Sequence, residues 1–218
     1  DDVVWWMREK VLSLNLKTWF HPTIDVQRNS KSDLYAFDGK SKFDIIQPGD
    51  LVHCDFGINY LTLNTDCQQI AYVLKPNESE APKYLSNALK EANRLQDIFT
   101  DNFGYKKTGN QILKESLEQA KSEGLNPQIY THPLGTFGHS AGTTLGMWDS
   151  QSGVPFKGDF QMNYNTSYAI ELNNKTFIKE WNKEVRIMLE EAGISEQKGF
   201  RYVNGRQTEI ILIGKNLH

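Results

Sequence analysis

No stretch of this 218-residue sequence approaches the roughly 20 consecutive apolar residues that a membrane-spanning helix needs. The first ten residues, DDVVWWMREK, lack the basic and then apolar pattern of a signal peptide, and they lack an initiator Met. We therefore expect no membrane partner and a chain that is the C-terminal part of a longer protein. The sequence leaves the compartment open, with the cytoplasm slightly favoured.

Cysteine and excess charge are also scarce. The two cysteines, Cys54 and Cys67, stand in no CxxC or zinc-ribbon spacing, which excludes a disulfide framework and a structural zinc site built on thiolates. A formal net charge of −3 gives no electrostatic case for binding nucleic acid or an anionic membrane. The expected partner is a small molecule, a short peptide or another protein, and a homodimer is one option.

The remaining composition is that of an ordinary globular protein. Hydrophobic residues make up 39% and charged residues 23% of the chain, which is long enough to bury a core. Neither an internal repeat nor a long linker divides the sequence, so we treat residues 1–218 as a single domain.

Hydrophobic spacing predicts the order of the secondary-structure elements. Apolar residues at helical spacing indicate helices over 3–16, 82–100 and 108–123, with Thr108 as the N-cap of the third. Short β-rich runs indicate a hairpin from 50–60 and 66–74, then strands over 167–173, 184–190, 200–203 and 207–213. This order favours an α+β fold with helices on one face of a largely antiparallel sheet.

The hairpin contains two aspartates, Asp55 and Asp66, in the stretch GDLVHCDFGINYLTLNTDC. If it turns near Tyr60 and Leu61, Asp55 lies across from Asp66, and Cys54 lies across from Cys67. Opposed like charges destabilise a sheet, and buried carboxylates need neutralisation or a cation. The two readings are surface acids on an exposed face or ligands of a divalent metal.

Three later residues favour the metal. His139 in GTFGHSAG, Glu171 in SYAIELN and Glu209 in GRQTEIILI each lie in an apolar setting. Together with the two aspartates they make an oxygen-rich set that suits two divalent ions. Mn, Co, Zn and Fe all suit such ligands, and manganese is the ion we carry forward.

The DFG-x6-NTD hairpin, the GHxxG histidine, the IEL glutamate and the terminal QTE together resemble the M24 metallopeptidases. These are the creatinase and methionine-aminopeptidase type enzymes with the pita-bread fold, and the resemblance is strongest to the Xaa-Pro aminopeptidase and dipeptidase branch. It runs from about Val3 to Ile213. The eleven-residue step between the aspartates and the order of the five ligand-type residues carry it.

The resemblance implies the activity and the roles of the residues. It implies a metal-dependent exopeptidase that hydrolyses an N-terminal peptide bond, of Xaa-Pro type, through a hydroxide activated by two metal ions. Asp55, Asp66, His139, Glu171 and Glu209 would be the metal ligands. Glu171 would also pass a proton to the leaving amine.

One ligand assignment has a rival. The stretch VRIMLEE resembles the strand that carries the last glutamate in proline peptidases, and this makes Glu190 the alternative to Glu209. We prefer Glu209 because Gln207 and Glu209 would share the inward face of a strand. Arg186 would then lie behind a ligand carboxylate or at the surface.

The sequence departs from the family at two auxiliary histidines that contact substrate. One is expected on the strand before that of the first aspartate and falls near Asp38; the other is expected seven residues after the ligand histidine and falls on Gly146. His132 and His21 are the candidate catalytic replacements, and His53 is a further candidate because it shares the face of Asp55.

These departures motivate alternatives to a peptidase. The first is a pseudo-enzyme or binding module that keeps the fold and the metal but lacks the auxiliary histidines. The second is a C–N hydrolase of the creatinase kind, which uses no metal; the intact ligand set argues against it.

Overall fold

The computed structural model describes residues 2–29 and 45–214. Its elements, in chain order, are α1 (Asp2–Ser13), β1 (Lys17–Thr18), β2 (Thr23–Gln27), β3 (Leu51–Phe56), β4 (Ile58–Tyr60), β5 (Leu63–Asn64), β6 (Cys67–Val73), α2 (Lys83–Asp101), α3 (Gly109–Ser122), β7 (Pro127–Ile129), β8 (His132–Pro133), β9 (Thr166–Ile178), β10 (Lys183–Glu196), β11 (Gly199–Tyr202) and β12 (Ile211–Ile213). None of the described helices is both long and apolar enough to cross a membrane.

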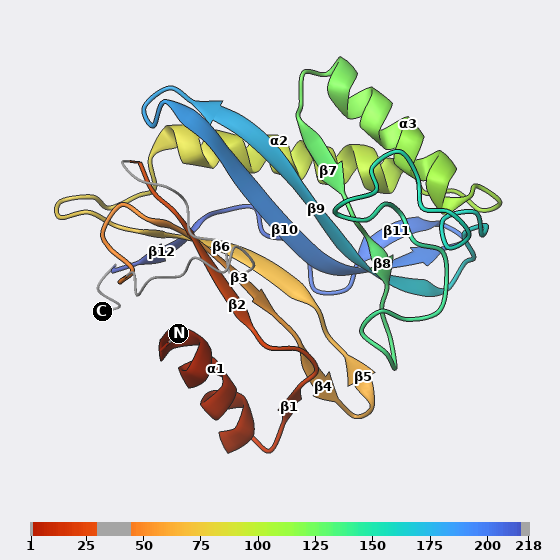
Figure 1. The fold of residues 1–218 in the computed structure, drawn as a ribbon, viewed down its shortest axis with the longest axis horizontal. Coiled ribbons are helices and arrows are strands. Elements are labelled where there is room, and N and C mark those ends of the chain that lie inside the picture. The colour runs from red at the N-terminus through yellow and green to blue at the C-terminus, as the bar shows by residue number, and fades with distance from the viewer. Residues whose placement is uncertain (1, 30–44, 215–218) are drawn as a thin grey trace.

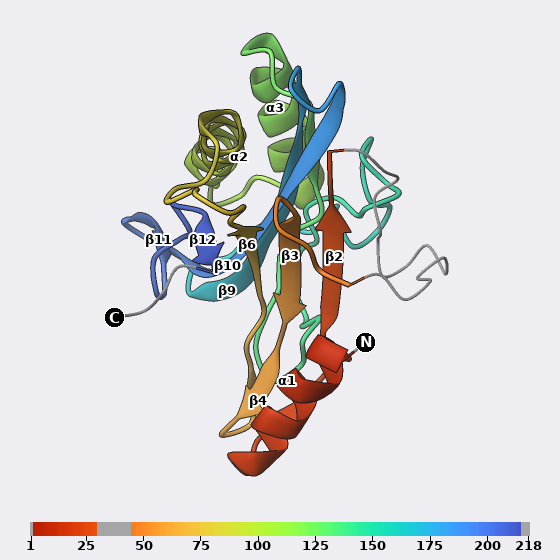
Figure 2. The same cartoon turned by 90° about the vertical axis from the view of Figure 1, so that its left-hand side faces the viewer.

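The main sheet has the strand order β2-β3-β6-β10-β9-β7, and β8, β11 and β12 add to β9, β10 and β6 respectively (Figure 1). All of these pairs are antiparallel except β12 with β6. Helices α2 and α3 lie on one side of the sheet, while α1 lies apart from them beside β1 and β2 (Figure 2). The predicted α+β fold with a curved, mainly antiparallel sheet is confirmed.

The two central helices begin and end close to the predicted residues. Helix α2 starts directly after Pro82, which suits the first turn of a helix because it lacks an amide proton. Helix α3 starts with a capping box: the Thr108 side chain accepts from the Gln111 amide, and the Gln111 side chain accepts from the Thr108 amide. Thr108 is therefore the N-cap, as the sequence predicts.

The core lies between α2, α3 and the sheet. Helix α2 contributes one buried stripe at helical spacing, made of Leu85, Ala88, Leu89, Ala92, Leu95, Ile98 and Phe99. Strands β9 and β10 contribute Ile170, Leu172, Ile187 and Leu189, which are all fully buried. Burying one such side chain stabilises the fold by about 1.5–3 kcal/mol, so this layer holds the sheet in place.

The long hairpin β9–β10 positions the later carboxylates. It pairs thirteen residues of each strand and extends beyond the predicted ranges 167–173 and 184–190. Side chains alternate between faces, and Ile170, Leu172 and Leu189 point into the core. Glu171 and Glu190, which are directly paired, therefore lie on the opposite face.

The predicted register of the first hairpin is wrong. Asp55 pairs with Gln68 and Cys54 with Gln69, so neither the aspartates nor the cysteines are directly opposed. The hairpin turns at Leu61 and Thr62, which both have positive φ, as a two-residue type I′ turn requires. This turn lies one residue later than predicted, which shifts the pairing by two residues and keeps both aspartates on one face.

The C-terminal strand also differs from the prediction. Only Ile211–Ile213 forms a strand, and it runs parallel to β6. Gln207 is buried because its side chain bonds the backbone of Ile70, whereas Glu209 is exposed. The prediction that Gln207 and Glu209 share the inward face of a strand is therefore wrong.

Candidate metal centre

Four carboxylates and one imidazole meet on the sheet face that points away from α2. Strand pairing aligns Glu171 with Glu190, Glu190 with Gln68, and Gln68 with Asp55, so these residues form one row across β9, β10, β6 and β3. Asp66 precedes the first residue of β6, and His132 comes from β8, which pairs with β9. The members of this carboxylate cluster are Asp55, Asp66, His132, Glu171 and Glu190.

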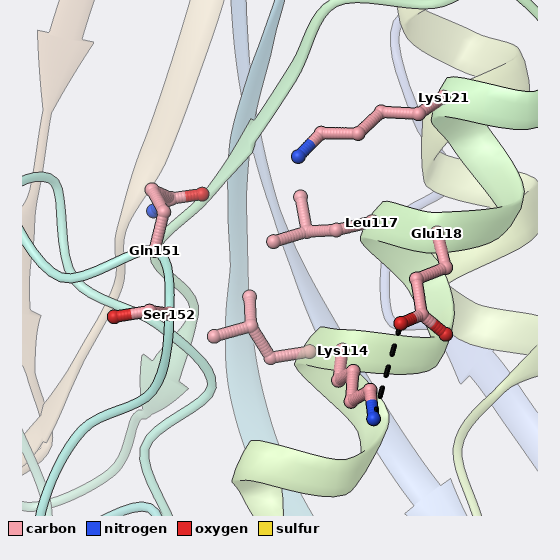
Figure 3. A pocket seen from close by; sticks show the side chains of 7 residues that line it. Lys114, Leu117, Glu118, Lys121, Gln151 and Ser152 are labelled. Atoms are coloured by element: carbon pink, nitrogen blue, oxygen red, sulfur yellow. Dashed lines mark ion pairs between the residues drawn. The ribbon is translucent and has the colours of Figure 1, made fainter.

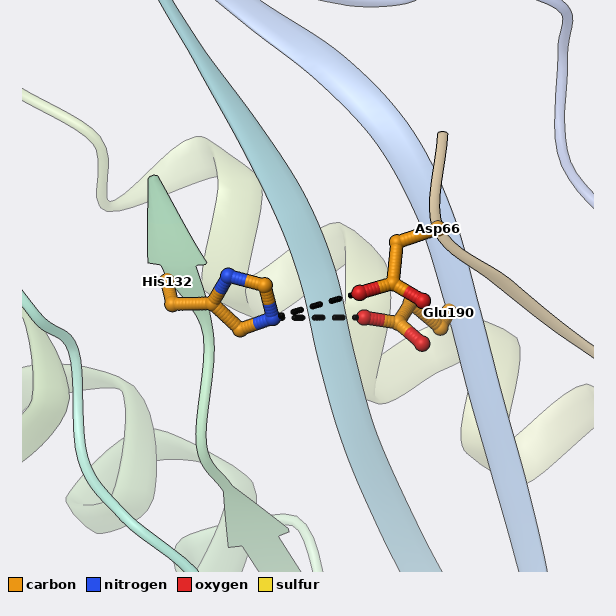
Figure 4. Close-up of side chains that lie close together, drawn as sticks. All are labelled: Asp66, His132 and Glu190. Carbon is orange, nitrogen blue, oxygen red and sulfur yellow. Dashed lines mark ion pairs between the residues drawn. The ribbon is translucent and has the colours of Figure 1, made fainter. Parts of the chain in front are cut away.

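His132 faces three of the carboxylates. Its Nε2 atom lies 3.6 Å from Asp66 Oδ2 and 3.6 Å from Glu190 Oε1 (Figure 4). The same atom lies 4.0 Å from Glu171 Oε2. Its other ring nitrogen, Nδ1, lies 3.1 Å from the Pro133 carbonyl and donates to it. Since the ring then carries its proton on Nδ1, Nε2 keeps a lone pair for a metal.

The ligand atoms form two overlapping groups. One group is Asp66, His132 and Glu190, and the other is Asp55, Glu171 and Glu190; within each group the atoms lie within 4.8 Å of one another. Glu190 belongs to both. A carboxylate with two oxygens can serve two neighbouring ions, so the arrangement has the donor set for a shared ligand.

Burial and mutual repulsion raise the pKa values of all four acids. Burial, reinforced by Asp25, raises the pKa of Asp55 to about 6, although His53 opposes the shift. Burial and the charge of Asp55 raise the pKa of Asp66 to about 8. Burial and the charge of Asp55 also raise the pKa of Glu171 well above its ordinary value, and burial and the charge of Glu171 do the same for the pKa of Glu190. Without a cation, the cluster therefore resists full ionisation.

The histidine responds in the opposite direction. Burial, with a further contribution from neighbouring His139, lowers the pKa of His132 to about 4. His132 is thus neutral near pH 7, and it does not supply the positive charge that the carboxylates lack.

The residues fit a divalent metal on two further observations. Asp55 Oδ1 and Glu190 Oε1 are buried oxygens without a hydrogen-bond partner. Within residues 2–29 and 45–214, no lysine or arginine forms an ion pair with the four carboxylates. Buried carboxylate oxygens of this kind are stabilised by a hard cation, and the mixed Asp, Glu and His set suits Mn, Fe, Co or Zn.

Three of the five predicted ligands lie in the cluster: Asp55, Asp66 and Glu171. Glu190, the rival assignment, occupies the place that the sequence analysis gave to Glu209. Glu209 is exposed and belongs to neither group. The β9–β10 hairpin could have identified Glu190 from the sequence, because a residue paired directly with Glu171 must lie on the same face of the sheet.

His132, and not the predicted His139, lies against the carboxylates. The ring of His139 lies 4.4 Å from that of His132 and 5.6 Å from that of Trp19, but His139 is exposed and belongs to neither ligand group. Partial desolvation of its ring and the charge of Lys157 lower the pKa of His139. If His132 is the ligand, the auxiliary histidine expected seven residues later is His139 itself.

Of the two other candidate histidines, one lies away from the carboxylate cluster and one lies beside it. His21 is exposed; its Nδ1 lies 2.8 Å from Arg8 Nη1 and its ring packs on Trp5, outside both ligand groups. His53 is buried beside the cluster and bonds Asp25 and Gln68, two residues that the sequence analysis did not single out.

The two positions expected to carry auxiliary histidines are accounted for separately. Gly146 has φ +78°, and a Cβ there would lie 2.1 Å from the Ile129 carbonyl, so the backbone leaves no room for a side chain. The position near Asp38 lies outside the described residues.

A small cavity of about 170 Å³ lies elsewhere, between α3 and the chain near Gln151 (Figure 3). Its rim includes the ion pair of Lys114 and Glu118, whose charged atoms are 3.9 Å apart. It shares no residue with the carboxylate cluster. Its lining residues are Leu113, Lys114, Leu117, Glu118, Lys121, Gln151 and Ser152.

No protein-family model matches the sequence, and no curated protein matches it. Solved structures do match the fold. The X-Pro aminopeptidase of Thermotoga maritima superposes with a TM-score of 0.70 at 13% identity, covering 97% of this chain and 55% of that one. Methionine aminopeptidase from Rickettsia prowazekii gives 0.64 at 11%, covering 92% and 84%.

A third similar structure is not named as a peptidase. The N-terminal domain of the FACT complex subunit SPT16 from chickpea gives a TM-score of 0.61 at 11% identity, covering 94% of this chain and 49% of that one. The chain spans about half the length of the first peptidase structures that it matches. These likenesses show that the chain has the pita-bread fold.

Proposed function

We propose that the chain is a metal-dependent exopeptidase domain that hydrolyses an N-terminal peptide bond. One observation carries the proposal: the fold aligns the paired carboxylates of Glu171 and Glu190 with Asp55, and adds Asp66 and the Nε2 of His132. Like charges opposed in this way destabilise a sheet unless something binds them. The peptidases among the structural neighbours support hydrolysis as the use of this site.

Asp66, His132 and Glu190 would hold one ion, and Asp55, Glu171 and Glu190 a second. When bound, such ions polarise a carbonyl and lower the pKa of a water molecule. The protein residues supply the remaining steps, which are binding the peptide and moving protons.

Glu171 is suited to proton transfer. Its side chain is 20% exposed, against 2% for Glu190, so it is the more accessible of this pair. Its Oε1 accepts from Gln68, which leaves Oε2 on the side of His132. A carboxylate oxygen in this position can take a proton from the attacking water and deliver it to the leaving amine.

His139 is suited to contact the peptide. It is exposed beside the buried His132, and Trp19 packs against its other side. A donor held there can stabilise the oxygen that becomes negative during attack, an interaction worth on the order of 100-fold in rate. This role removes one of the two reasons for expecting an inactive relative.

The substrate proposed is a short peptide with proline in the second position, and the metal proposed is manganese. The X-Pro aminopeptidase and Xaa-Pro dipeptidase among the neighbours support this choice over other peptides. The alternative is a metal-binding module without catalysis; the SPT16 domain is relevant to it because this fold also occurs in a protein that is not named as a peptidase.

The test is hydrolysis of a panel of Xaa-Pro and Met-Xaa peptides by the chain reconstituted with Mn²⁺. We expect release of the N-terminal residue, and its loss in Glu171→Gln. A protein that binds Mn²⁺ tightly yet cleaves no member of the panel would support the binding module instead.

A further inference from the structure

A buried chain of hydrogen bonds leads from β2 to the carboxylate cluster. His53 Nδ1 lies 2.9 Å from Asp25 Oδ2, and His53 Nε2 lies 2.8 Å from Gln68 Oε1. Gln68 Nε2 then donates to Glu171 Oε1 at 2.6 Å and to Glu190 Oε2 at 3.1 Å. These hydrogen bonds therefore connect side chains from five strands of the sheet: β2, β3, β6, β9 and β10.

The chemistry of these groups determines which atom donates and which accepts in each hydrogen bond. Gln68 has two N–H bonds on Nε2, and each meets a carboxylate oxygen, so its Oε1 can only accept. The facing atom, His53 Nε2, must therefore carry a proton and donate it. Asp25 fixes the ring by its contact with Nδ1. A rotated Gln68 amide would instead point its oxygen at two carboxylate oxygens, which repel it.

The bonds from Gln68 also set which oxygens remain for a metal. Each glutamate gives one oxygen to Gln68 and turns the other toward His132: Glu171 Oε2 at 4.0 Å and Glu190 Oε1 at 3.6 Å from Nε2. Glu190 Oε1 is the buried oxygen without a partner. The amide therefore occupies one oxygen of each of the two opposed carboxylates and leaves the other oxygen free to bind a metal.

We propose that Gln68 is a positioning residue, held by His53 and Asp25, that pre-orients Glu171 and Glu190 for metal binding. The inference rests on the proposed function in that it takes these carboxylates to be metal ligands. Asp25, His53 and Gln68 are only 6%, 4% and 3% exposed, so water does not compete for their hydrogen bonds. Partners that orient ligand side chains are typically worth 10–100-fold in metal affinity.

The test compares Gln68→Met with Gln69→Met by calorimetric titration of Mn²⁺. Both substitutions remove an amide from β6, but Gln69 bonds Glu191 on the other face and serves as the matched control. We expect about 10–100-fold weaker binding for Q68M and wild-type binding for Q69M. Equal affinity of Q68M, Q69M and the wild type would overturn the positioning role while leaving the metal site intact.

A second measurement does not depend on the variants folding. In the metal-free wild type, ¹⁵N NMR should find His53 protonated on Nε2 and the Gln68 side-chain amide protected from exchange. An unprotonated His53 Nε2, or a rapidly exchanging Gln68 side-chain amide, would contradict the assigned hydrogen bonds and overturn the positioning role. A wild type that shows these signals but binds no Mn²⁺ would overturn the proposed function and the positioning role together.

Discussion

Replacing Glu190 by Gln should change stability and metal affinity in opposite directions. Glu190 is directly paired with Glu171, is 1% exposed, and has one oxygen without a partner. Gln keeps the shape and can still accept from Gln68, but it removes the charge. In the metal-free protein at pH 8 we therefore expect a gain on the order of 1 kcal/mol in the free energy of unfolding.

The same change should weaken Mn²⁺ binding. Removing one partner of a buried charge pair costs about 3–5 kcal/mol, which corresponds to roughly 10²- to 4 × 10³-fold in Kd. The assays are urea unfolding in chelator and calorimetric titration of Mn²⁺.

The matched control is Glu209→Gln, which changes an exposed residue and should alter stability by less than about 0.5 kcal/mol and leave the Kd unchanged. Weaker Mn²⁺ binding in E209Q together with unchanged binding in E190Q would contradict Glu190 as a ligand and favour Glu209, the residue predicted from the sequence.

Three further outcomes follow from the structure. In chelator, the thermal midpoint should fall as pH rises from 5 to 9, because the raised pKa values of Asp55 (about 6) and Asp66 (about 8) favour the folded state only while these groups are protonated; a midpoint that rises with pH would contradict this. His132→Ala should weaken Mn²⁺ binding on the order of 100-fold, whereas His139→Ala should keep the affinity and lower kcat by about as much; the reverse pattern, from titration and peptide kinetics, would reassign them. Thr108→Ala should cost about 1 kcal/mol in urea unfolding without changing the Mn²⁺ affinity, and no loss would mean that the capping box contributes nothing.

Local patterns in the sequence were sufficient for the fold class and most helix ends. The capping box at Thr108 and the apolar stripe of α2 depend on residues a few positions apart, so sequence reveals them directly. The register of the first hairpin could not be read in this way. It depends on positive φ at Leu61 and Thr62, neither of which is a residue that usually marks such a turn.

The candidate ligands could be predicted where they lie in long strands, and not where their position depends on loops. The apolar setting of Glu171 in SYAIELN and the IEL resemblance singled out Glu171, and the rule that directly paired strand residues share a face would have identified Glu190. Two histidines seven residues apart are equivalent by sequence alone. Only the pairing of β8 with β9 brings His132, rather than His139, against the carboxylates.

The buried partners of the cluster were invisible for a different reason. Asp25 lies in a strand that was not predicted from the sequence, and Gln68 is one of two adjacent glutamines near the start of an otherwise apolar strand. Their importance comes from contacts between residues up to 122 positions apart.

The most direct test of the account is anomalous diffraction from crystals of the protein grown with Mn²⁺. We expect two anomalous peaks. One should be enclosed by Asp66, His132 and Glu190, and the other by Asp55, Glu171 and Glu190. An absence of peaks between these residues, or a peak held instead by His139 or Glu209, would contradict it.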